Sequence, residues 1–182
     1  IGNKKAVPIL MDGLKRLEND VISQKGLSHV VILFGNNDCW LTAGGHHQVF
    51  LEQMQQNLKE IGVRIRANGQ VPLFCNLQPI DSVKLLRTRP DLMEHQSAVK
   101  VDATAFQKGY SDAIESLARE LGFDWIDIRN GLEHQMDQVV ANDGLHPNDK
   151  GHRIIAQTIL EFLKVLDPAI RISDEYENTL TS

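Results

Sequence analysis

The sequence predicts an α/β fold in which helices cover both faces of a parallel β-sheet, and three observations support this prediction. Helical and extended apolar patterns alternate along the 182 residues, as they do when helices join parallel strands. The run at residues 30–34 is apolar on both faces, which is typical of a strand inside a parallel sheet. The length allows one domain with its own core, and 42% hydrophobic and 24% charged residues form an ordinary globular composition.

Four helices are expected where apolar residues recur at intervals of three or four positions. Gly26 ends the first helix and Gly122 the third, because glycine readily adopts the backbone conformation that closes a helix. The apolar positions are, in chain order, Leu10, Leu14, Leu17 and Val21; Phe50, Met54, Leu58 and Ile61; Phe106, Tyr110, Ile114, Leu117 and Leu121; and Ile155, Ile159, Phe162 and Leu166.

Three strands are expected between these helices, at residues 30–34, 71–77 and 123–128. Pro72 marks the start of the second strand rather than its centre, since proline lacks the N–H group that a strand interior needs. The order of elements therefore predicts three layers, with the sheet between two layers of helices.

The remaining segments set the domain organisation. Residues 78–100 are expected to form a long connecting loop, of the kind that often serves as a lid or a binding loop. One domain is expected to cover residues 1–166, followed by a polar C-terminal tail at residues 167–182.

Composition and charge exclude several classes of function. The net charge is −5 and the sequence has no basic run, so no nucleic-acid partner is expected. The longest apolar run, residues 30–34, is too short to span a membrane. Cys39 and Cys75 form neither a disulfide framework nor a zinc motif, so we expect reduced thiols in a reducing, cytoplasmic compartment and no metal site.

Polar residues follow the first expected strand in the order Gly35, Asn36, Asn37, Asp38. Ligands of parallel α/β sheets bind outside the carboxyl ends of the strands, so this turn lies where a site is expected. An asparagine amide there can donate a hydrogen bond to a developing oxyanion, and Asp38 can brace the turn by accepting backbone N–H groups. By itself, the stretch is more typical of a polar turn that ends a strand.

A second candidate stretch precedes the last helix and contains Asp143, Gly144, His146 and Pro147. His146 can take and return a proton near neutral pH, and a carboxylate on its other ring nitrogen would fix its tautomer. Gly144 allows the loop to fold Asp143 back onto the ring. By itself, this stretch is more typical of a helix entry, with Asn148 as the capping residue.

Taken together, the two stretches resemble the SGNH, or GDSL-type, serine hydrolase family. Gly35 to Asp38 resembles its Gly-x-Asn-Asp block, and Asp143 to His146 resembles its Asp-x-x-His block in the Asp-Gly-x-His-Pro form. The resemblance implies a flavodoxin-like three-layer fold and an esterase or acyl hydrolase that forms an acyl-enzyme without any cofactor. It also implies that His146 is the general base, that Asp143 orients it, and that Asn37 and the backbone of Gly2 form the oxyanion hole.

The nucleophile is where the sequence departs from the family. The family's Gly-Asp-Ser block is absent from residues 1–182, and no serine follows an expected strand. The family's sheet also has more strands than the three expected here. We therefore expect the first strands and the nucleophilic serine to lie upstream of Ile1, with this chain as the distal portion of the hydrolase domain.

Other residues could shape a substrate pocket. Asp38, Trp40 and Pro79 are candidates, although Trp40 is equally typical of a core position. His46 and His47 could line the mouth of the pocket or be solvated. We expect a small-molecule, carbohydrate or lipid ester as substrate, while the sequence does not indicate an oligomeric state.

Two other classes of function fit the same fold. One is a catalytically inactive binding domain in which the family residues only brace loops, and the residues that precede Ile1 would distinguish it from an enzyme. The other is a domain that binds a nucleotide or a flavin, which is disfavoured because no glycine-rich phosphate loop follows an expected strand.

Overall fold

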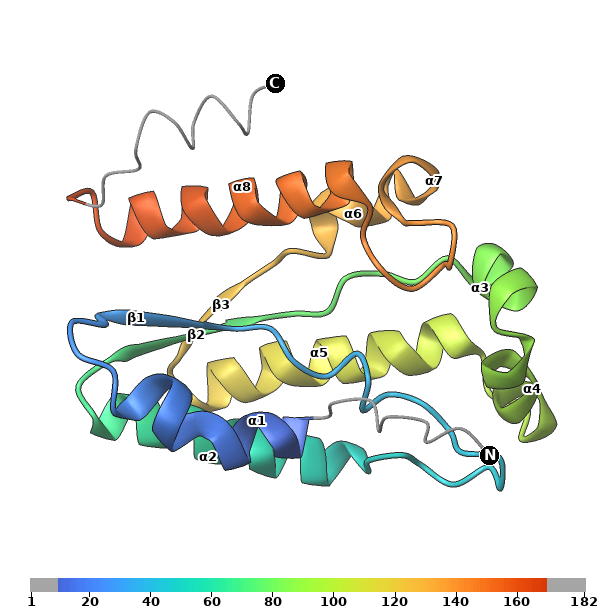
Figure 1. Ribbon diagram of the computed structural model, residues 1–182, viewed down its shortest axis with the longest axis horizontal. Coiled ribbons are helices and arrows are strands. Elements are labelled where there is room, and N and C mark those ends of the chain that lie inside the picture. Colours follow the sequence, from blue (N-terminus) through green and yellow to red (C-terminus); the bar gives the residue numbers. More distant parts are fainter. Residues whose placement is uncertain (1–9, 170–182) are drawn as a thin grey trace.

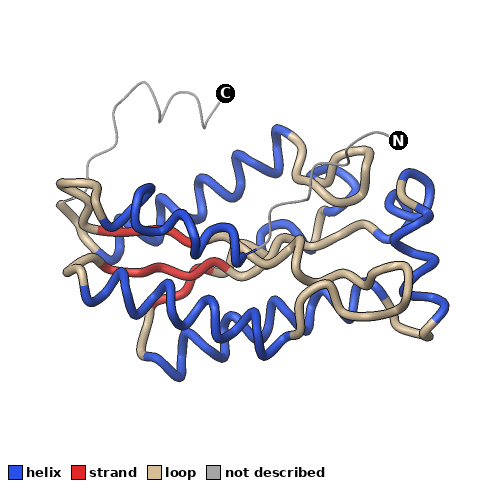
Figure 2. The backbone as a smooth tube through the Cα atoms, turned by 60° about the horizontal axis from the view of Figure 1, so that its bottom comes forward, coloured by secondary structure: helices blue, strands red, loops and turns tan. Residues whose placement is uncertain are grey.

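The computed structural model describes residues 10–169 and confirms the α/β class. Three parallel strands form one sheet in the order β1-β2-β3, and helices lie on both sides of it (Figures 1 and 2). The strands are β1 (His29–Ile32), β2 (Val71–Cys75) and β3 (Asp124–Ile126). Each of the three expected strands is therefore present, although each is shorter at its carboxyl end than the apolar pattern suggested.

Pro72 lies inside β2, which is flanked by strands on both sides, and the register explains how the sheet tolerates it. Val71 donates its N–H to the carbonyl of Ser28 at 2.8 Å, on the side of β1. Alternate N–H groups of a strand point to opposite sides, so position 72 faces β3. The ladder with β3 begins only at the next residue, where Leu73 pairs with Asp124. No hydrogen bond of the ladder is therefore lost.

One face of the sheet is covered by α1 (Leu10–Leu17), α2 (Leu51–Ala67) and α5 (Ala103–Leu121). A short π-helical turn, η1 (Glu18–Ile22), extends α1. The apolar positions predicted for these three helices pack with Phe74 and Ile32 of the sheet in one large cluster, except Phe50, which is exposed at the start of α2. This cluster fixes the start of α5 and the loop that follows β1, which is where the first candidate stretch lies.

The opposite face is covered by α6 (Asn130–Glu133), α7 (Met136–Val139) and α8 (Asp149–Leu166). Asn148 caps α8 as expected, because its side-chain oxygen accepts the N–H of Gly151 at 3.0 Å. The last helix ends at Leu166. The polar tail proposed for residues 167–182 falls mostly outside the described residues and stays a prediction.

The prediction of a long loop at residues 78–100 is wrong, because this segment contains α3 (Ser82–Thr88) and α4 (Pro90–Ala98). Asp81 caps α3 by accepting the N–H groups of Val83 and Lys84 at 3.0 Å each. Pro90 begins α4, where a missing N–H group costs nothing. Both helices are too short to show a clear apolar period, which is why the sequence pattern did not reveal them.

A search of residues 10–169 finds no helix with both the length and the apolar character needed to cross a membrane.

Candidate functional site

Asp143 and His146 form a hydrogen-bonded pair within one short loop, which we call the His146 loop (residues 141–147). The Oδ2 atom of Asp143 lies 2.6 Å from Nδ1 of His146. Its Oδ1 atom accepts the backbone N–H groups of Leu145 at 2.9 Å and of His146 at 3.0 Å. With Nδ1 engaged, Nε2 is the ring nitrogen left to exchange a proton with a reacting group.

Electrostatics favour the ionised form of Asp143. Partial burial raises the pKa of this carboxyl, but the hydrogen bonds from the His146 ring and from two backbone N–H groups outweigh it, so the pKa is lowered below 3.8. The side chain of His146 is 65% exposed. The pair therefore presents a solvent-accessible imidazole that is oriented by a carboxylate.

Gly144 determines the shape of the His146 loop. Its φ is +77°, and a Cβ atom at this position would lie 2.3 Å from the backbone nitrogen of Leu85 and 2.6 Å from the carbonyl oxygen of Asp81. The carbonyl of Gly144 accepts the N–H of Asp81 at 2.9 Å. The loop can approach α3 this closely only because position 144 has no side chain.

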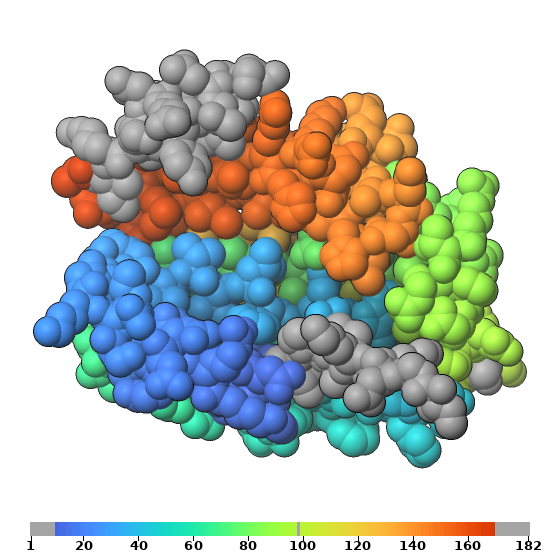
Figure 3. Space-filling model, viewed as in Figure 1, coloured from blue at the N-terminus to red at the C-terminus, as the bar shows by residue number. Residues whose placement is uncertain are grey.

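The first turn and the end of α3 add further contacts to this loop. Thr88 donates its hydroxyl to the carbonyl of Asp143 at 2.8 Å. Lys84 donates to the carbonyl of Val140, which directly precedes the loop, at 2.8 Å. In the space-filling view, the loop lies against α3 at one end of the molecule (Figure 3). Residues 78–100, expected to be a loop, therefore form a helical support for His146.

The first candidate stretch, which we call the asparagine loop (residues 35–38), follows β1 and lines a pocket of about 270 Å³. Gly35 has φ +125°, and a Cβ atom there would lie 3.2 Å from Leu77, so the turn requires glycine. Asn36 and Asn37 are half-buried in the wall of this pocket. The other lining residues are Leu33, Phe34, Asp38, Leu77 and Gln78.

Asp38 is almost fully buried and holds the start of α1. Its two carboxylate oxygens accept the N–H of Leu10 at 3.1 and 3.3 Å. Burial raises the pKa of Asp38 above 3.8, and the hydrogen bond from Leu10 only partly offsets this rise. The brace expected of Asp38 therefore reaches a distant helix rather than its own turn.

The remaining predicted site residues lie in different places. Trp40 is buried with Ile80 and Leu85 in a separate apolar cluster, and Pro79 is also buried. Among the described residues, neither belongs to the lining of the 270 Å³ pocket. Gly2, predicted as an oxyanion donor, lies outside the described residues.

Both candidate loops flank the segment that follows β2. Gln78 lines the pocket beside the asparagine loop, and Asp81, three residues later, is bonded to the His146 loop. Figure 1 shows both loops on the side of the sheet where the strands end. The structure thus brings Asn37, Asp143 and His146 to the same edge, as the parallel topology predicts.

The two cysteine thiols and His47 have surroundings that are typical of structural rather than catalytic residues. Burial raises the pKa of Cys39 and raises that of Cys75 to about 12, so neither thiol is activated as a nucleophile. His47 lies 3.3 Å from the Tyr110 hydroxyl and stacks on Phe50 at 4.9 Å. Residues 10–169 contain no group of three side chains able to hold a metal ion.

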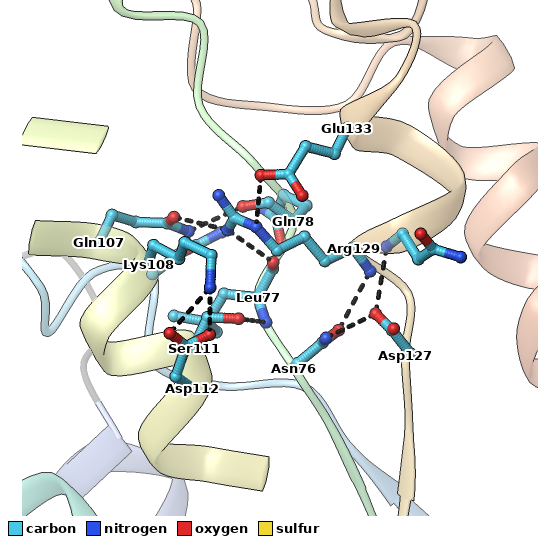
Figure 4. A network of polar contacts seen from close by, with 12 residues as sticks. Asn76, Leu77, Gln78, Gln107, Lys108, Ser111, Asp112, Asp127, Arg129 and Glu133 are labelled. Atoms are coloured by element: carbon cyan, nitrogen blue, oxygen red, sulfur yellow. Dashed lines mark hydrogen bonds and ion pairs between the residues drawn. The ribbon is translucent and has the colours of Figure 1, made fainter. Parts of the chain in front are cut away.

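Sequence reasoning missed Gln107 and Arg129, which are buried beside the asparagine loop. Gln107 donates to Asn36 at 2.7 Å. Arg129 donates to Gln107 at 2.8 Å (Figure 4). A glutamine on a helix face and an arginine after a strand are ordinary surface residues in sequence terms. Only the fold shows that they meet.

Comparison with known proteins gives consistent results. Residues 5–154 match the sequence model of the GDSL-like lipase/acylhydrolase family. The chain is 26% identical to the GDSL esterase/lipase WDL1 of Oryza sativa subsp. japonica and 28% identical to the GDSL esterase/lipase CPRD49 of Arabidopsis thaliana, each over 143 residues. These residues are 75% of this chain and 54% of each relative, so the chain spans about half the length of these relatives.

A solved structure has the same fold. The lipase/acylhydrolase from Enterococcus faecalis superposes with a TM-score of 0.68 at 21% identity, covering 86% of this chain and 71% of that one.

Proposed function

The chain belongs to the GDSL-like lipase/acylhydrolase family, and we propose that the full-length protein hydrolyses carboxylic esters by way of an acyl-enzyme. The observation that carries the proposal is the 2.6 Å contact between Asp143 and His146, whose ring is solvent-accessible. An imidazole held in one tautomer by a carboxylate is the arrangement that a general base needs.

Each residue has a role in the proposed reaction. A serine Oγ attacks the ester carbonyl while Nε2 of His146 accepts its proton, and the same nitrogen then protonates the departing alcohol. Asp143 stays ionised and stabilises the imidazolium. The oxyanion of the tetrahedral intermediate accepts a hydrogen bond from the Asn37 amide, assisted by a backbone N–H, for which Gly2 is the candidate. Water then attacks the acyl-enzyme by the same path.

The choice of Asn37 over Asn36 as oxyanion donor rests on the position of each residue in the Gly-x-Asn-Asp block of the family. Asn37 is the asparagine at the position of the family motif, and it lines the pocket. We propose that the nucleophile is a serine in sequence preceding Ile1, within a Gly-Asp-Ser block that follows an apolar strand.

The proposed substrate is an ester of a small molecule, a carbohydrate or a lipid. The His146 loop contacts α3 through Gly144 and Thr88. Residues of α3 and α4 are therefore placed to shape the site around the acyl or alcohol group, and we assign substrate preference to this helical pair.

The test is hydrolysis of p-nitrophenyl acetate by the full-length protein and by two histidine variants. His146→Ala should lower kcat by about 10³-fold or more, since it removes the base. His152→Ala, an exposed histidine on α8, should retain wild-type activity. Full activity of His146→Ala would overturn the assignment. A sequence before Ile1 that lacks Gly-Asp-Ser, together with an inactive wild type, would favour a non-catalytic binding domain.

A further inference from the structure

One buried side chain, that of Gln107 on α5, is hydrogen-bonded to the segments that follow all three strands. Figure 4 shows it beside Gln78 and Arg129. Its Nε2 donates to Oδ1 of Asn36, after β1, and to the carbonyl of Gln78, after β2, each at 2.7 Å. Its Oε1 accepts from Nη1 of Arg129, after β3, at 2.8 Å. Gln107 is fully buried, so its polar atoms depend on these partners.

Arg129 anchors this arrangement from the side of β3. Its guanidinium also donates to the carbonyl of Leu77 at 3.3 Å and to Glu133 at 3.1 Å. Its backbone N–H donates to Asn76 at 3.1 Å. Arg129 is only 4% exposed, and burial of a charge costs free energy that a well-packed apolar side chain would avoid. Packing alone therefore does not account for an arginine at this position.

These hydrogen bonds run in one direction, from the charged guanidinium of Arg129 toward the pocket that Asn36 lines. Arg129 donates to the carbonyl end of Gln107, and the amide end of Gln107 donates to the carbonyl end of Asn36. The two amide dipoles are thus aligned, and each bond polarises the next. The chain ends at Nδ2 of Asn36, a buried donor that has no hydrogen-bond partner among the described residues.

We propose that Gln107 and Arg129 are positioning residues for the oxyanion hole. They fix the side chain of Asn36, and through the shared backbone they hold Asn37 at the pocket wall in one orientation. A donor that is already oriented stabilises the oxyanion without reorganisation during the reaction. The catalytic consequence rests on the proposed ester hydrolysis, whereas the ordering of the asparagine loop does not.

The first test compares two methionine substitutions on adjacent residues of α5. Gln107→Met keeps the size of the side chain and removes its hydrogen bonds, while Lys108→Met removes only an exposed ion pair with Asp112. In the full-length protein, hydrogen–deuterium exchange of residues 33–39 and 76–79 should become faster in Gln107→Met alone. Unchanged exchange there, or an increase spread evenly over the sheet, would overturn the proposal.

Kinetics on p-nitrophenyl acetate provide the second readout. A displaced oxyanion donor lowers kcat, and we expect a loss of about 10- to 100-fold in Gln107→Met, with KM changed less than about twofold. The pH profile of kcat should keep its shape, because the Asp143–His146 pair is untouched. A fall that appears only in KM, or a shifted profile, would contradict the positioning role.

A double variant shows whether Gln107 acts through Asn36. Asn36→Ala removes the end of the chain and lies in a half-buried turn, so it also serves if Gln107→Met does not fold. The variant with both changes should have a kcat no lower than that of the less active single variant. Multiplied losses would mean that the residues act independently, which would overturn the proposed chain.

Failure of the proposed function gives a different result from failure of this inference. If the wild type hydrolyses no ester, the exchange comparison of Gln107→Met with Lys108→Met still decides whether Gln107 orders the asparagine loop. If the wild type is active and the exchange of that loop does not respond, the inference fails while the function stands.

Discussion

The His146 loop and the asparagine loop flank the same segment after β2, but their polar side chains are oriented by different kinds of contact. In the His146 loop, the bonds that orient the ring join residues no more than three positions apart. In the asparagine loop, Asn36 is held by Gln107, 71 positions away, and Asp38 holds Leu10, 28 positions away. Local hydrogen bonds therefore orient the Asp143–His146 pair, whereas the side chains of Asn36 and Asp38 depend on partners from distant parts of the fold.

The two acidic residues of these loops differ in the same way. Asp143 is partly exposed and hydrogen-bonded to a histidine, and its pKa is lowered. Asp38 is buried, and desolvation raises its pKa above the usual value despite the N–H of Leu10. Identical side chains thus have opposite tendencies to ionise, because Asp143 accepts hydrogen bonds from His146 and from backbone N–H groups, whereas burial dominates at Asp38. The comparison supports the catalytic role proposed for Asp143 and a structural role for Asp38.

The largest expected effect is that of Asp143→Asn. The asparagine oxygen can still accept the N–H groups of the loop, but the His146 tautomer is no longer fixed. We therefore expect kcat for p-nitrophenyl acetate to fall by about 10³- to 10⁴-fold with little change in fold. Activity close to that of the wild type would show that His146 needs no orienting carboxylate.

The same variant carries a pH dependence of stability. The pKa of Asp143 is lowered in the folded protein, so its contribution to stability is present above pH 3.8 and is lost as the pH falls through the lower folded value. The wild type should therefore be slightly more stable than Asp143→Asn at neutral pH. Urea unfolding across pH 2–7 should show this difference vanish at the acidic end.

The next largest effect is expected from Gly144→Ala, which tests how closely the His146 loop must approach α3. The new Cβ would meet backbone atoms of Leu85 and Asp81, and we expect a loss of about 2–4 kcal/mol in the free energy of unfolding. Gly69→Ala is the matched control, because Gly69 also has positive φ, +83°, but open space around it. It should lose only about 1 kcal/mol. Equal losses would mean that backbone strain alone requires glycine at position 144.

The parts of the fold that the sequence predicted are those that local patterns encode. The strands, the helices α1, α2, α5 and α8, and the cap at Asn148 follow from apolar spacing and capping chemistry within a few residues. The placement of Asn37 and His146 at one sheet edge follows from parallel topology. Both motifs could therefore be located from the sequence alone.

The remainder depends on contacts between distant residues. The helices α3 and α4 are short and begin with Asp81 as a cap and with Pro90, respectively, so no apolar period indicates them. Nothing near Gln107 or Arg129 in the sequence indicates that they meet under the pocket. Asp38 has the correct motif position, but its partner Leu10 is chosen by the packing of α1.

A smaller effect on stability is expected from Asp38→Asn, which tests the structural role of Asp38. Asparagine can still accept the N–H of Leu10 and does not carry a buried charge. Because the folded pKa of Asp38 is raised, its favourable contribution is present below pH 3.8 and is lost as the pH rises through the folded value. Asp38→Asn should thus be more stable than the wild type by about 1 kcal/mol at pH 7, and this advantage should disappear near pH 3.5.

Thermal unfolding at several pH values measures this difference. Asp124→Asn, an exposed aspartate on β3, serves as the control and should show no such crossover. If Asp38→Asn is instead less stable at pH 7, the carboxylate charge itself holds α1, and Asp38 is more than a neutral acceptor.

The smallest effect, that of Thr88→Val, asks how self-contained the His146 loop is. Valine keeps the shape of threonine but cannot donate to the carbonyl of Asp143, so we expect a loss of about 0.5–1 kcal/mol in stability. Ser116→Ala on α5 is the control, because its hydroxyl bonds only a carbonyl of its own helix, that of Asp112. If α3 merely supports the loop, both variants keep wild-type kcat. A drop in kcat confined to Thr88→Val would show that the orientation of the Asp143–His146 pair also depends on a distant helix, and the contrast between the two loops would then be one of degree.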